Sequence, residues 1–284
     1  SGNIYNTAVG SQAGKAVTTG AANTLVGALA GDALTDADDN VVIGTAALSS
    51  DTLGSHTVAI GKNALFAQNF TTASNSFNTA VGHAAGNKVT SGVNNVLIGG
   101  SAGDALTGSG FDGNAARVAG ADSNVAVGRG ALGDDTKGNK SVAIGQDALN
   151  GQNFTSATDS NNVAVGFQAG LAVGTGTGNT LLGNEAGRGN SSAKLTGTNN
   201  TALGFQAGYS LQGAAAGNVF VGALAGDLTD DGASNVAVGA SALSANCANQ
   251  NSAVGKDALQ VCTGGLNTAV GQAAGVGVTS GSNN

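Results

Sequence analysis

The chain of 284 residues contains no proline, tryptophan or methionine, and only two cysteines and two tyrosines. Charged residues make up 10% of it and aromatic residues 4%, which is far from the composition of an ordinary globular domain. No run approaches the roughly 18 apolar residues of a membrane-spanning helix. We therefore expect no membrane insertion by this segment.

Positive charge is scarce as well. Ten lysines and arginines stand against seventeen carboxylates, for a net charge of −7, and no basic stripe is present that would follow a phosphate backbone. Nucleic acid is therefore not an expected partner. Carboxylates gather at Asp36, Asp38–Asp39, Asp134–Asp135 and Asp230–Asp231, where Ca²⁺ is conceivable. Neither the EF-hand spacing nor a calcium-binding nonapeptide accompanies them, so we expect solvated turns and no cofactor.

The side chains that build catalytic sites are few and do not converge. His56 and His83 lie one repeat apart at different phases, and the sole glutamate, Glu185, has no second carboxylate at a matching phase. A polysaccharide-cleaving solenoid would need such a carboxylate pair and aromatic residues for sugar stacking. We therefore predict that the protein is not an enzyme and has no catalytic or metal-ligating residues.

What the chain does have is one short repeat, as in Asn6–Gly10 and Asn267–Gly271. Its glycine, called the repeat glycine below, occurs fifteen times, mostly at spacings of 16 to 18 residues, with three spacings of 21 and one of 29. Short periods with insertions confined to one part of the unit are typical of solenoids in which each repeat is one coil. The repeat glycines are Gly10, Gly27, Gly44, Gly61, Gly82, Gly99, Gly128, Gly145, Gly166, Gly183, Gly204, Gly222, Gly239, Gly255 and Gly271.

Positions counted from the repeat glycine have distinct characters. Position −1 is always Val, Ile or Leu, and position −3 is Thr, Val or once Ser, so these residues share one face of a strand of about four residues. We predict position −1 as the core column. It comprises Val9, Val26, Ile43, Ile60, Val81, Ile98, Val127, Ile144, Val165, Leu182, Leu203, Val221, Val238, Val254 and Val270.

The opposite face of the strand, at position −2, is also apolar. It is mostly alanine, with Leu25, Leu97, Leu181 and Phe220 among the exceptions. Strands that are apolar on both faces are typical of buried parallel sheets. We therefore expect a parallel β-solenoid of about 15 coils, with something further, such as a second chain, covering the second face.

Two other positions hardly vary. Position +3 is alanine in all fifteen repeats, which indicates that another backbone or side chain approaches closely there, either across a narrow coil or across a chain-to-chain contact. Position −4 is asparagine in thirteen repeats and is Thr57 or Ser141 in the other two. Stacked asparagines can hydrogen-bond from coil to coil, and we prefer this interpretation to a polar binding row.

A longer period lies above the short one. The segment beginning at Asn40 matches the segment beginning at Asn124 over three coils at a constant shift of 84 residues. The larger unit is thus about four coils, with insertions at equivalent corners. We expect residues 1–284 to form one continuous solenoid that is a fragment of a longer fibre.

The two cysteines follow consecutive repeat glycines at almost the same distance. Cys247 lies eight residues after Gly239 and Cys262 seven after Gly255, so they are expected at one corner of neighbouring coils. Coils stack about 4.8 Å apart, within the roughly 4.4–6.8 Å between Cα atoms that a disulfide spans. We predict a disulfide and hence an extracellular setting; two inert buried thiols are the alternative.

Runs such as Ser141–Gly145, Thr57–Gly61 and Asn235–Gly239 resemble the repeat of YadA-like heads in trimeric autotransporter adhesins, and related repeats occur in bacteriophage fibres. The resemblance covers nearly the whole chain. It implies a left-handed parallel β-roll, three chains side by side and a place on a bacterial surface. The family coil is shorter than the coil here, and no neck, stalk or anchor is recognisable. No binding residue carries over, because the shared positions are those that build the coil.

We predict a non-enzymatic structural or adhesive fibre segment on a cell or virion surface. It would be a homo-oligomer, either a trimer or an end-to-end filament, and a cell-surface receptor or glycan is a possible partner. The variable positions after the repeat glycine and the inserted corners are the expected contacts. The candidates are Lys62, Arg129 and Lys256 and the corner aromatics Phe70, Phe77, Phe111 and Phe154.

The sequence is also compatible with two other functions. A self-assembling extracellular filament with a mechanical role is the second hypothesis. An ice- or crystal-surface binder is the third, because threonine recurs at position −3, as at Thr7, Thr24, Thr180 and Thr201. It ranks last because valine is as frequent in that column and the column shares the predicted core face.

Overall fold

The computed structural model describes residues 4–108 and 120–284. Throughout these residues the protein is all-β, without a helix, and it is a parallel β-solenoid of about 15 coils with 17 residues per turn. The predicted fold class is thereby confirmed. The chain divides into two compact units, Ser1–Ser141 with Asn153–Asp159 and Val142–Gln152 with Ser160–Asn284. The expectation of one continuous solenoid stays a prediction.

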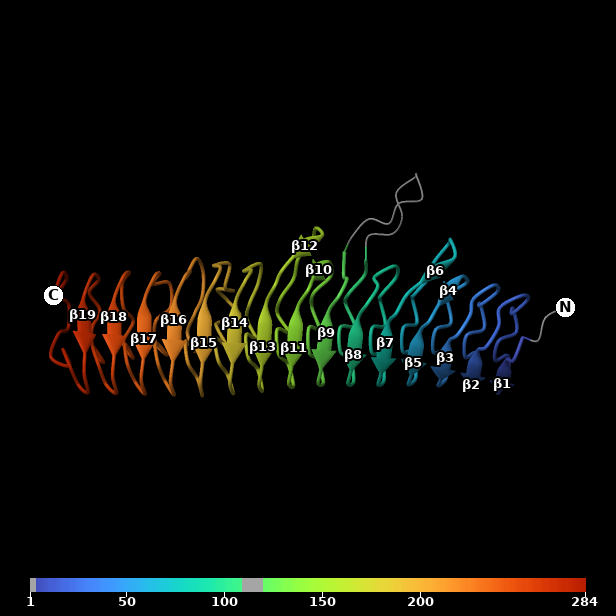
Figure 1. The fold of residues 1–284 in the computed structure, drawn as a ribbon, viewed down its shortest axis with the longest axis horizontal. Coiled ribbons are helices and arrows are strands. Elements are labelled where there is room, and N and C mark those ends of the chain that lie inside the picture. The colour runs from blue at the N-terminus through green and yellow to red at the C-terminus, as the bar shows by residue number, and fades with distance from the viewer. Residues whose placement is uncertain (1–3, 109–119) are drawn as a thin grey trace. The chain divides into compact units, whose positions relative to one another are not determined.

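Unit 1, the unit that contains the N-terminal coils, is a ladder of three-residue strands. Neighbouring strands are parallel and in register, so that Val58 pairs with Thr79 and Ile60 with Val81. Figure 1 shows these arrows side by side and pointing the same way. The strands are β1 (Thr7–Val9), β2 (Thr24–Val26), β3 (Val41–Ile43), β5 (Val58–Ile60), β7 (Thr79–Val81), β8 (Val96–Ile98) and β9 (Val125–Val127).

Unit 2 repeats this arrangement with its own ladder of parallel strands. Thr180 pairs with Thr201 and Leu182 with Leu203, so each position of the repeat again lies on the same position of the next coil. The strands are β11 (Val142–Ile144), β13 (Val163–Val165), β14 (Thr180–Leu182), β15 (Thr201–Leu203), β16 (Val219–Val221), β17 (Val236–Val238), β18 (Ser252–Val254) and β19 (Thr268–Val270).

Two of the inserted corners form small sheets of their own, both in unit 1. In one, β4 (Gly54–Ser55) pairs in parallel with β6 (Ser74–Asn75). In the other, β10 (Gly138–Asn139) pairs with β12 (Thr158–Asp159). Equivalent residues of the two corners are 84 positions apart, so the longer period found in the sequence is also a structural period.

The inside of each coil is filled from position −2 and position +3. Position +3 alanines such as Ala64 and Ala207 are fully buried, as are Leu97 and Phe220 at position −2. The predicted close approach at position +3 is thereby confirmed. Position +4 completes this core, because it is either glycine or a buried leucine such as Leu65, which adopts a φ of +49°.

Large side chains at position −2 depend on glycine at position +4. A Cβ added to Gly31 would lie 2.9 Å from Leu25 Cδ2, and one added to Gly14, in the preceding coil, would lie 2.5 Å from Leu25 Cδ1. Phe220 stands in the same relation to Gly208 and Gly226. Each bulky residue thus occupies the space that two glycines leave open, since interiors are close-packed.

The repeat glycines lie directly on one another. A Cβ on Gly61 would lie 2.4 Å from the carbonyl oxygen of Gly82, and Gly61 has a φ of +131°, which side chains rarely adopt. The backbones of successive coils therefore approach too closely for any other residue. This contact explains why the glycine is invariant.

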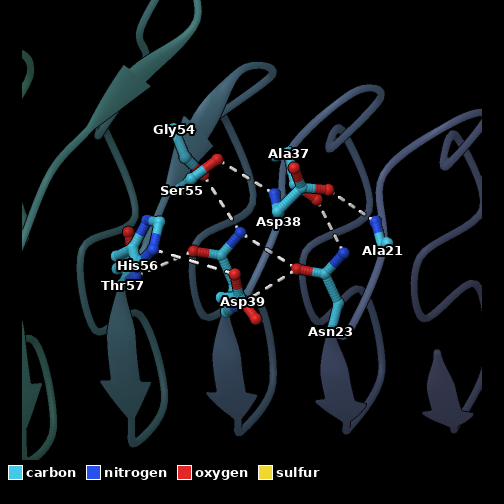
Figure 2. Close-up of polar contacts among 10 residues, drawn as sticks. Ala21, Asn23, Ala37, Asp38, Asp39, Gly54, Ser55, His56 and Thr57 are labelled. Carbon is cyan, nitrogen blue, oxygen red and sulfur yellow. Dashed lines mark hydrogen bonds and ion pairs between the residues drawn. The ribbon is translucent and has the colours of Figure 1, made fainter. Parts of the chain in front are cut away.

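The position −4 asparagines form a buried ladder. Asn40 donates from both its backbone nitrogen and Nδ2 to Asn23 Oδ1, each at 3.0 Å, and its Nδ2 also donates to the Gly54 carbonyl at 3.0 Å. Its Oδ1 accepts from the backbone nitrogen of Thr57 at 2.9 Å. Figure 2 shows this chain of contacts running from coil to coil. The predicted coil-to-coil bonding is confirmed, and full burial of Asn23 and Asn40 rules out an exposed binding row.

Candidate functional site

The aliphatic column at position −1 lies on the outer face of each sheet and not in the core. In strands such as β3 and β15 the middle residue is buried while position −1 is exposed, with Ile43 39% and Leu203 46% exposed. The predicted core column is therefore wrong, because the narrow coil has room inside only for position −2. The outer-face residues are Val9, Val26, Ile43, Ile60, Val81, Ile98, Val127, Ile144, Val165, Leu182, Leu203, Val221, Val238, Val254 and Val270.

Position −3 shares that outer face. Its residues are exposed or half-buried, as at Val41 and Thr180. In unit 1 Thr7 pairs with Thr24, and in unit 2 Thr180 pairs with Thr201. The outer face of each unit is thus a regular surface of aliphatic and threonine side chains, and we call it the outer strand face. Contiguous apolar surface of this kind is typical of a site that another molecule covers.

The basic residues predicted as contacts lie at position +1 and are all exposed. Lys62 and Arg129 belong to unit 1, where they follow β5 and β9, with β7 and β8 between them. Lys256 follows β18 in unit 2, and its Nζ lies 3.4 Å from Asp257 Oδ2. The structure therefore places each of these side chains at the surface of its own unit.

The aromatic predictions are partly wrong. Phe70 is fully buried and Phe154 is 5% exposed, because each side chain fills the interior of its widened corner. Phe111 lies outside the described residues. Phe77 is 54% exposed, as expected. The other exposed phenylalanines are Phe66, Phe167 and Phe205; Phe167 and Phe205 were recognisable from their place at position +1.

The acidic corners serve the contacts between coils. Asp38 Oδ1 accepts a hydrogen bond from the backbone nitrogen of Ala21 at 2.7 Å, and Asp36 Oδ1 accepts one from Thr19 Oγ1 at 2.6 Å. Figure 2 shows Asp38 between Ala21 and Ser55. Within residues 4–108 and 120–284, no three His, Cys, Asp or Glu side chains are grouped so that they could hold a metal ion.

The two histidines belong to unit 1 and the glutamate to unit 2. His56 Nε2 lies 3.7 Å from Asp39 Oδ2, and its ring centre lies 5.4 Å from that of Phe77. His83 is exposed at position +1 of the coil that follows β7. Glu185, in unit 2, bonds to Gln206 Nε2 at 2.7 Å and lies 3.5 Å from Arg188 Nε. Each of the three therefore has its own surroundings.

Both cysteines are buried free thiols, so the expected disulfide is not formed in the structure. Cys247 Sγ lies 3.0 Å from Thr229 Oγ1, and Cys262 Sγ accepts a hydrogen bond from Asn267 Nδ2 at 3.2 Å. Each sulfur thus has a polar partner other than the second cysteine. Burial raises the pKa of the Cys247 thiol, which disfavours the thiolate that disulfide formation needs.

A buried polar cluster replaces the asparagine ladder where position −4 is Thr57. Gln68 Nε2 donates to Thr57 Oγ1 at 3.1 Å and to Asp51 Oδ2 at 2.7 Å, and Gln68 Oε1 accepts from Asn78 Nδ2 at 2.9 Å. Asp51 Oδ1 accepts from the backbone nitrogens of Gly54 and Phe70. Burial raises the pKa of the Asp51 carboxyl above its ordinary value of 3.8, although these hydrogen bonds oppose the rise.

Asp51 makes stability depend on pH. Because its pKa is raised in the folded state, its favourable contribution is complete below the ordinary value of 3.8 and is lost as pH rises through the raised value. Asp51→Ala is expected to lose about 3 kcal/mol of unfolding free energy, since three donors lose their acceptor. That loss should be larger near pH 3 than near pH 7. Urea unfolding at both pH values measures it.

The exposed corner residue Asp134 supplies the control. Asp134→Ala is expected to change the unfolding free energy by less than about 0.5 kcal/mol. A loss for Asp51→Ala that is equal at the two pH values would contradict the assigned burial of this carboxyl.

No protein-family model matches the chain, and no curated protein matches it. Over the part of the chain that the structure describes, no helix is long and apolar enough to cross a membrane.

Proposed function

We propose that the protein is a non-enzymatic structural and adhesive fibre segment, exposed on a cell or virion surface, whose outer strand face is covered by further copies of the same chain. The observation that carries this proposal is the row of exposed aliphatic side chains along each unit. Most of these side chains are already more than half buried, with Val165 36% and Leu203 46% exposed, so covering the rest of each contributes on the order of 1 kcal/mol. A repeated row of such residues therefore favours association strongly.

The outer strand face suits a copy of the chain because its pattern is regular. The same position of the repeat recurs on each strand of a unit, so a second copy offers side chains at matching spacing. The resemblance to YadA-like heads favours three chains side by side. An end-to-end filament with a mechanical role is the alternative assembly. The exposed side chains of position +1 and the inserted corners then stay available to a receptor.

Two lysines on the outer strand face should prevent association. We expect the unaltered chain to be a trimer and Val165→Lys/Val238→Lys to be a monomer, because each lysine must lose water to enter an apolar interface. Both valines are partly exposed, at 36% and 37%, so the coil itself tolerates the change. Native mass spectrometry measures the state.

Gln146→Lys/Asn184→Lys is the matched control, since it adds the same charge at exposed sites of position +1 in the same unit. It should associate as the unaltered chain does. A polymer of undefined length would favour the filament. A monomeric unaltered chain at micromolar concentration would overturn the proposed association.

One observation favours a second candidate function, binding to ice or another crystal surface. The threonine column had been expected to share the core face, but the outer face presents it, with Thr7 beside Thr24 and Thr180 beside Thr201. Thermal hysteresis of the monomeric variant would separate this function from the fibre function.

A further inference from the structure

Unit 2 contains a pocket of about 390 Å³ that no position of the repeat accounts for. Three consecutive coils supply its walls, through Arg188 and Asn190 from the first, Tyr209 and Gln212 from the second, and Asp230 from the third. Its size is that of a site for a small ligand.

The pocket lies where the regular order of coils is interrupted. The coil after β14 is 21 residues long and carries an insert. The insert is held by buried Leu195, which bridges to Val173, and by Lys194 Nζ, which donates to the carbonyl oxygen of Gly151 at 2.8 Å. Because these contacts hold the insert in place, the pocket beside it has a defined shape.

Rare residue types gather around this pocket. Tyr209 is one of two tyrosines in the chain and Arg188 is one of three arginines, while Glu185, which pairs with Arg188, is the sole glutamate. In a chain with 10% charged and 4% aromatic residues, the building of a coil does not require this concentration. These residue types are those that recognise a polar ligand.

Arg188 is held in place by side chains of three coils. Its Nε donates to Gln168 Oε1 at 3.1 Å and lies 3.5 Å from Glu185 Oε1. Its Nη1 donates to the hydroxyl of Tyr209 at 3.1 Å, and its guanidinium lies 5.4 Å from the centre of that ring. Within the described residues no group accepts from Nη2, so Arg188 retains a donor for a ligand.

The opposite wall offers acceptors. Gln212 Nε2 donates to Asp230 Oδ2 at 3.2 Å. Burial opposes ionisation of Asp230, yet hydrogen bonds from Asp231 and Asn246 lower its pKa overall, so it is a carboxylate at neutral pH. The charge of Arg188 is balanced by Glu185, and Asp230 adds a negative charge, so the site disfavours anions.

These features select one class of ligand. A neutral ligand must offer both donors and acceptors, to match the carboxylate of Asp230, the amide of Gln212 and the free donor of Arg188. It must also have an apolar face, to lie against Leu228, which is 54% exposed, and the Tyr209 ring. A pyranose combines hydroxyl groups around its rim with an apolar C–H face.

We propose that this pocket binds a neutral saccharide. This proposal names the class of partner for the adhesive role proposed above. It rests on that adhesive role and not on the association of chains. Its walls belong to the corners of the coils, and none of them is an outer-face residue of position −1 or −3. Saccharide binding is therefore expected equally in the chain and in the monomeric variant Val165→Lys/Val238→Lys, which makes the two failures distinguishable.

The test uses the purified chain on a printed panel of neutral and acidic oligosaccharides, followed by titration of the bound oligosaccharide. We expect a neutral oligosaccharide to bind. Tyr209→Ala and Asp230→Asn should each weaken its binding at least tenfold, because one removes the ring and the other a charged acceptor. Phe205, an exposed aromatic residue four positions before Tyr209 in the same coil, does not line the pocket, so Phe205→Ala should change binding less than twofold.

Three results would overturn the proposal: no neutral oligosaccharide binding at millimolar concentration, a preference for acidic glycans, or undiminished binding by the variants. Tyr209→Ala removes a partner of Arg188, so its melting curve is compared with that of the unaltered chain. Should it fail to fold, Asp230→Asn decides, because the amide has nearly the size and shape of the carboxylate.

Discussion

Replacing Gly61 with alanine is expected to lower the unfolding free energy by on the order of 4 kcal/mol. The added Cβ would lie 2.4 Å from the carbonyl oxygen of Gly82, and the φ of +131° is unfavourable for alanine. Backbone strain of this kind costs about 1–3 kcal/mol, and forcing the coils apart costs about 1–3 kcal/mol more. Urea unfolding followed by circular dichroism measures the loss.

Two other glycines separate these contributions. Gly271 has a φ of +129°, but a Cβ there would have no neighbour nearer than 3.8 Å, so Gly271→Ala should show the strain alone. A Cβ on Gly100 would meet nothing within 4 Å, and its φ is not positive, so Gly100→Ala should change stability by less than about 1 kcal/mol. A loss at Gly61 no larger than that at Gly271 would refute the close contact between coils.

Asn200→Ala is expected to cost a similar amount for a different reason. Asn200 is fully buried, and its Nδ2 donates to the carbonyl oxygen of Ala215 at 2.8 Å. Its Oδ1 accepts from the backbone nitrogen and Nδ2 of Asn218 at 3.1 and 3.0 Å. Each buried group left without a partner costs about 1–3 kcal/mol, so we expect a loss on the order of 4 kcal/mol. Thermal and urea unfolding measure it.

The control for the ladder is Asn184→Ala in the same unit. Asn184 is exposed at position +1, so this change should cost less than about 0.5 kcal/mol. Hydrogen exchange adds a local measure, because Asn200→Ala should speed exchange of the Asn218 amide. Equal stability of the two variants would show that the ladder does not hold the coils together.

The sequence was sufficient for the architecture because its invariant positions each have one structural explanation. Asparagine at position −4 predicted a coil-to-coil ladder, which Asn40 forms. Alanine at position +3 predicted a close approach, either inside a narrow coil or between chains, and buried Ala64 lies inside the coil. The short repeat predicted a solenoid and the two apolar faces of the strand predicted parallel pairing, and each strand does lie on the same strand of the next coil. A fold of this kind can be predicted from sequence because every coil uses the same residues in the same structural roles.

The same reasoning misassigned the inside of the strand. Both faces are apolar, so alternation with a period of two does not show which one is enclosed. The discriminating signal is residue size: Leu25 and Phe220 occur only beside coils with glycine at position +4, which only an inward side chain requires. The prediction that Phe70 is exposed was wrong for a related reason. An aromatic residue in an inserted corner can either pack inside that corner or lie exposed on its surface, and the sequence does not distinguish the two.

The sequence did not predict the pocket around Arg188, because its lining residues are distant in sequence and their positions in the repeat have no distinctive residue type. Arg188 and Tyr209 are both five residues after a repeat glycine, so the period alone places them one above the other. Without the insert that follows Arg188, nothing in that column indicates a concavity. The packing of the insert against Val173 is a tertiary contact that no local pattern encodes.

The dependence of bulky position −2 residues on two glycines governs how a chain of this kind can lengthen during evolution. A coil carrying Leu25 or Leu97 is compatible only with a predecessor that has glycine at position +4, namely Gly14 or Gly86. A duplicated copy of such a coil still has a predecessor with glycine at position +4, because the original coil carries one. If the original predecessor is lost, the bulky side chain no longer has that glycine beneath it. Recombination should therefore keep each bulky coil together with its predecessor as one module. Coils with leucine at position +4 can be lost from between two modules, and the modules around Leu181 and Phe220 do follow one another directly.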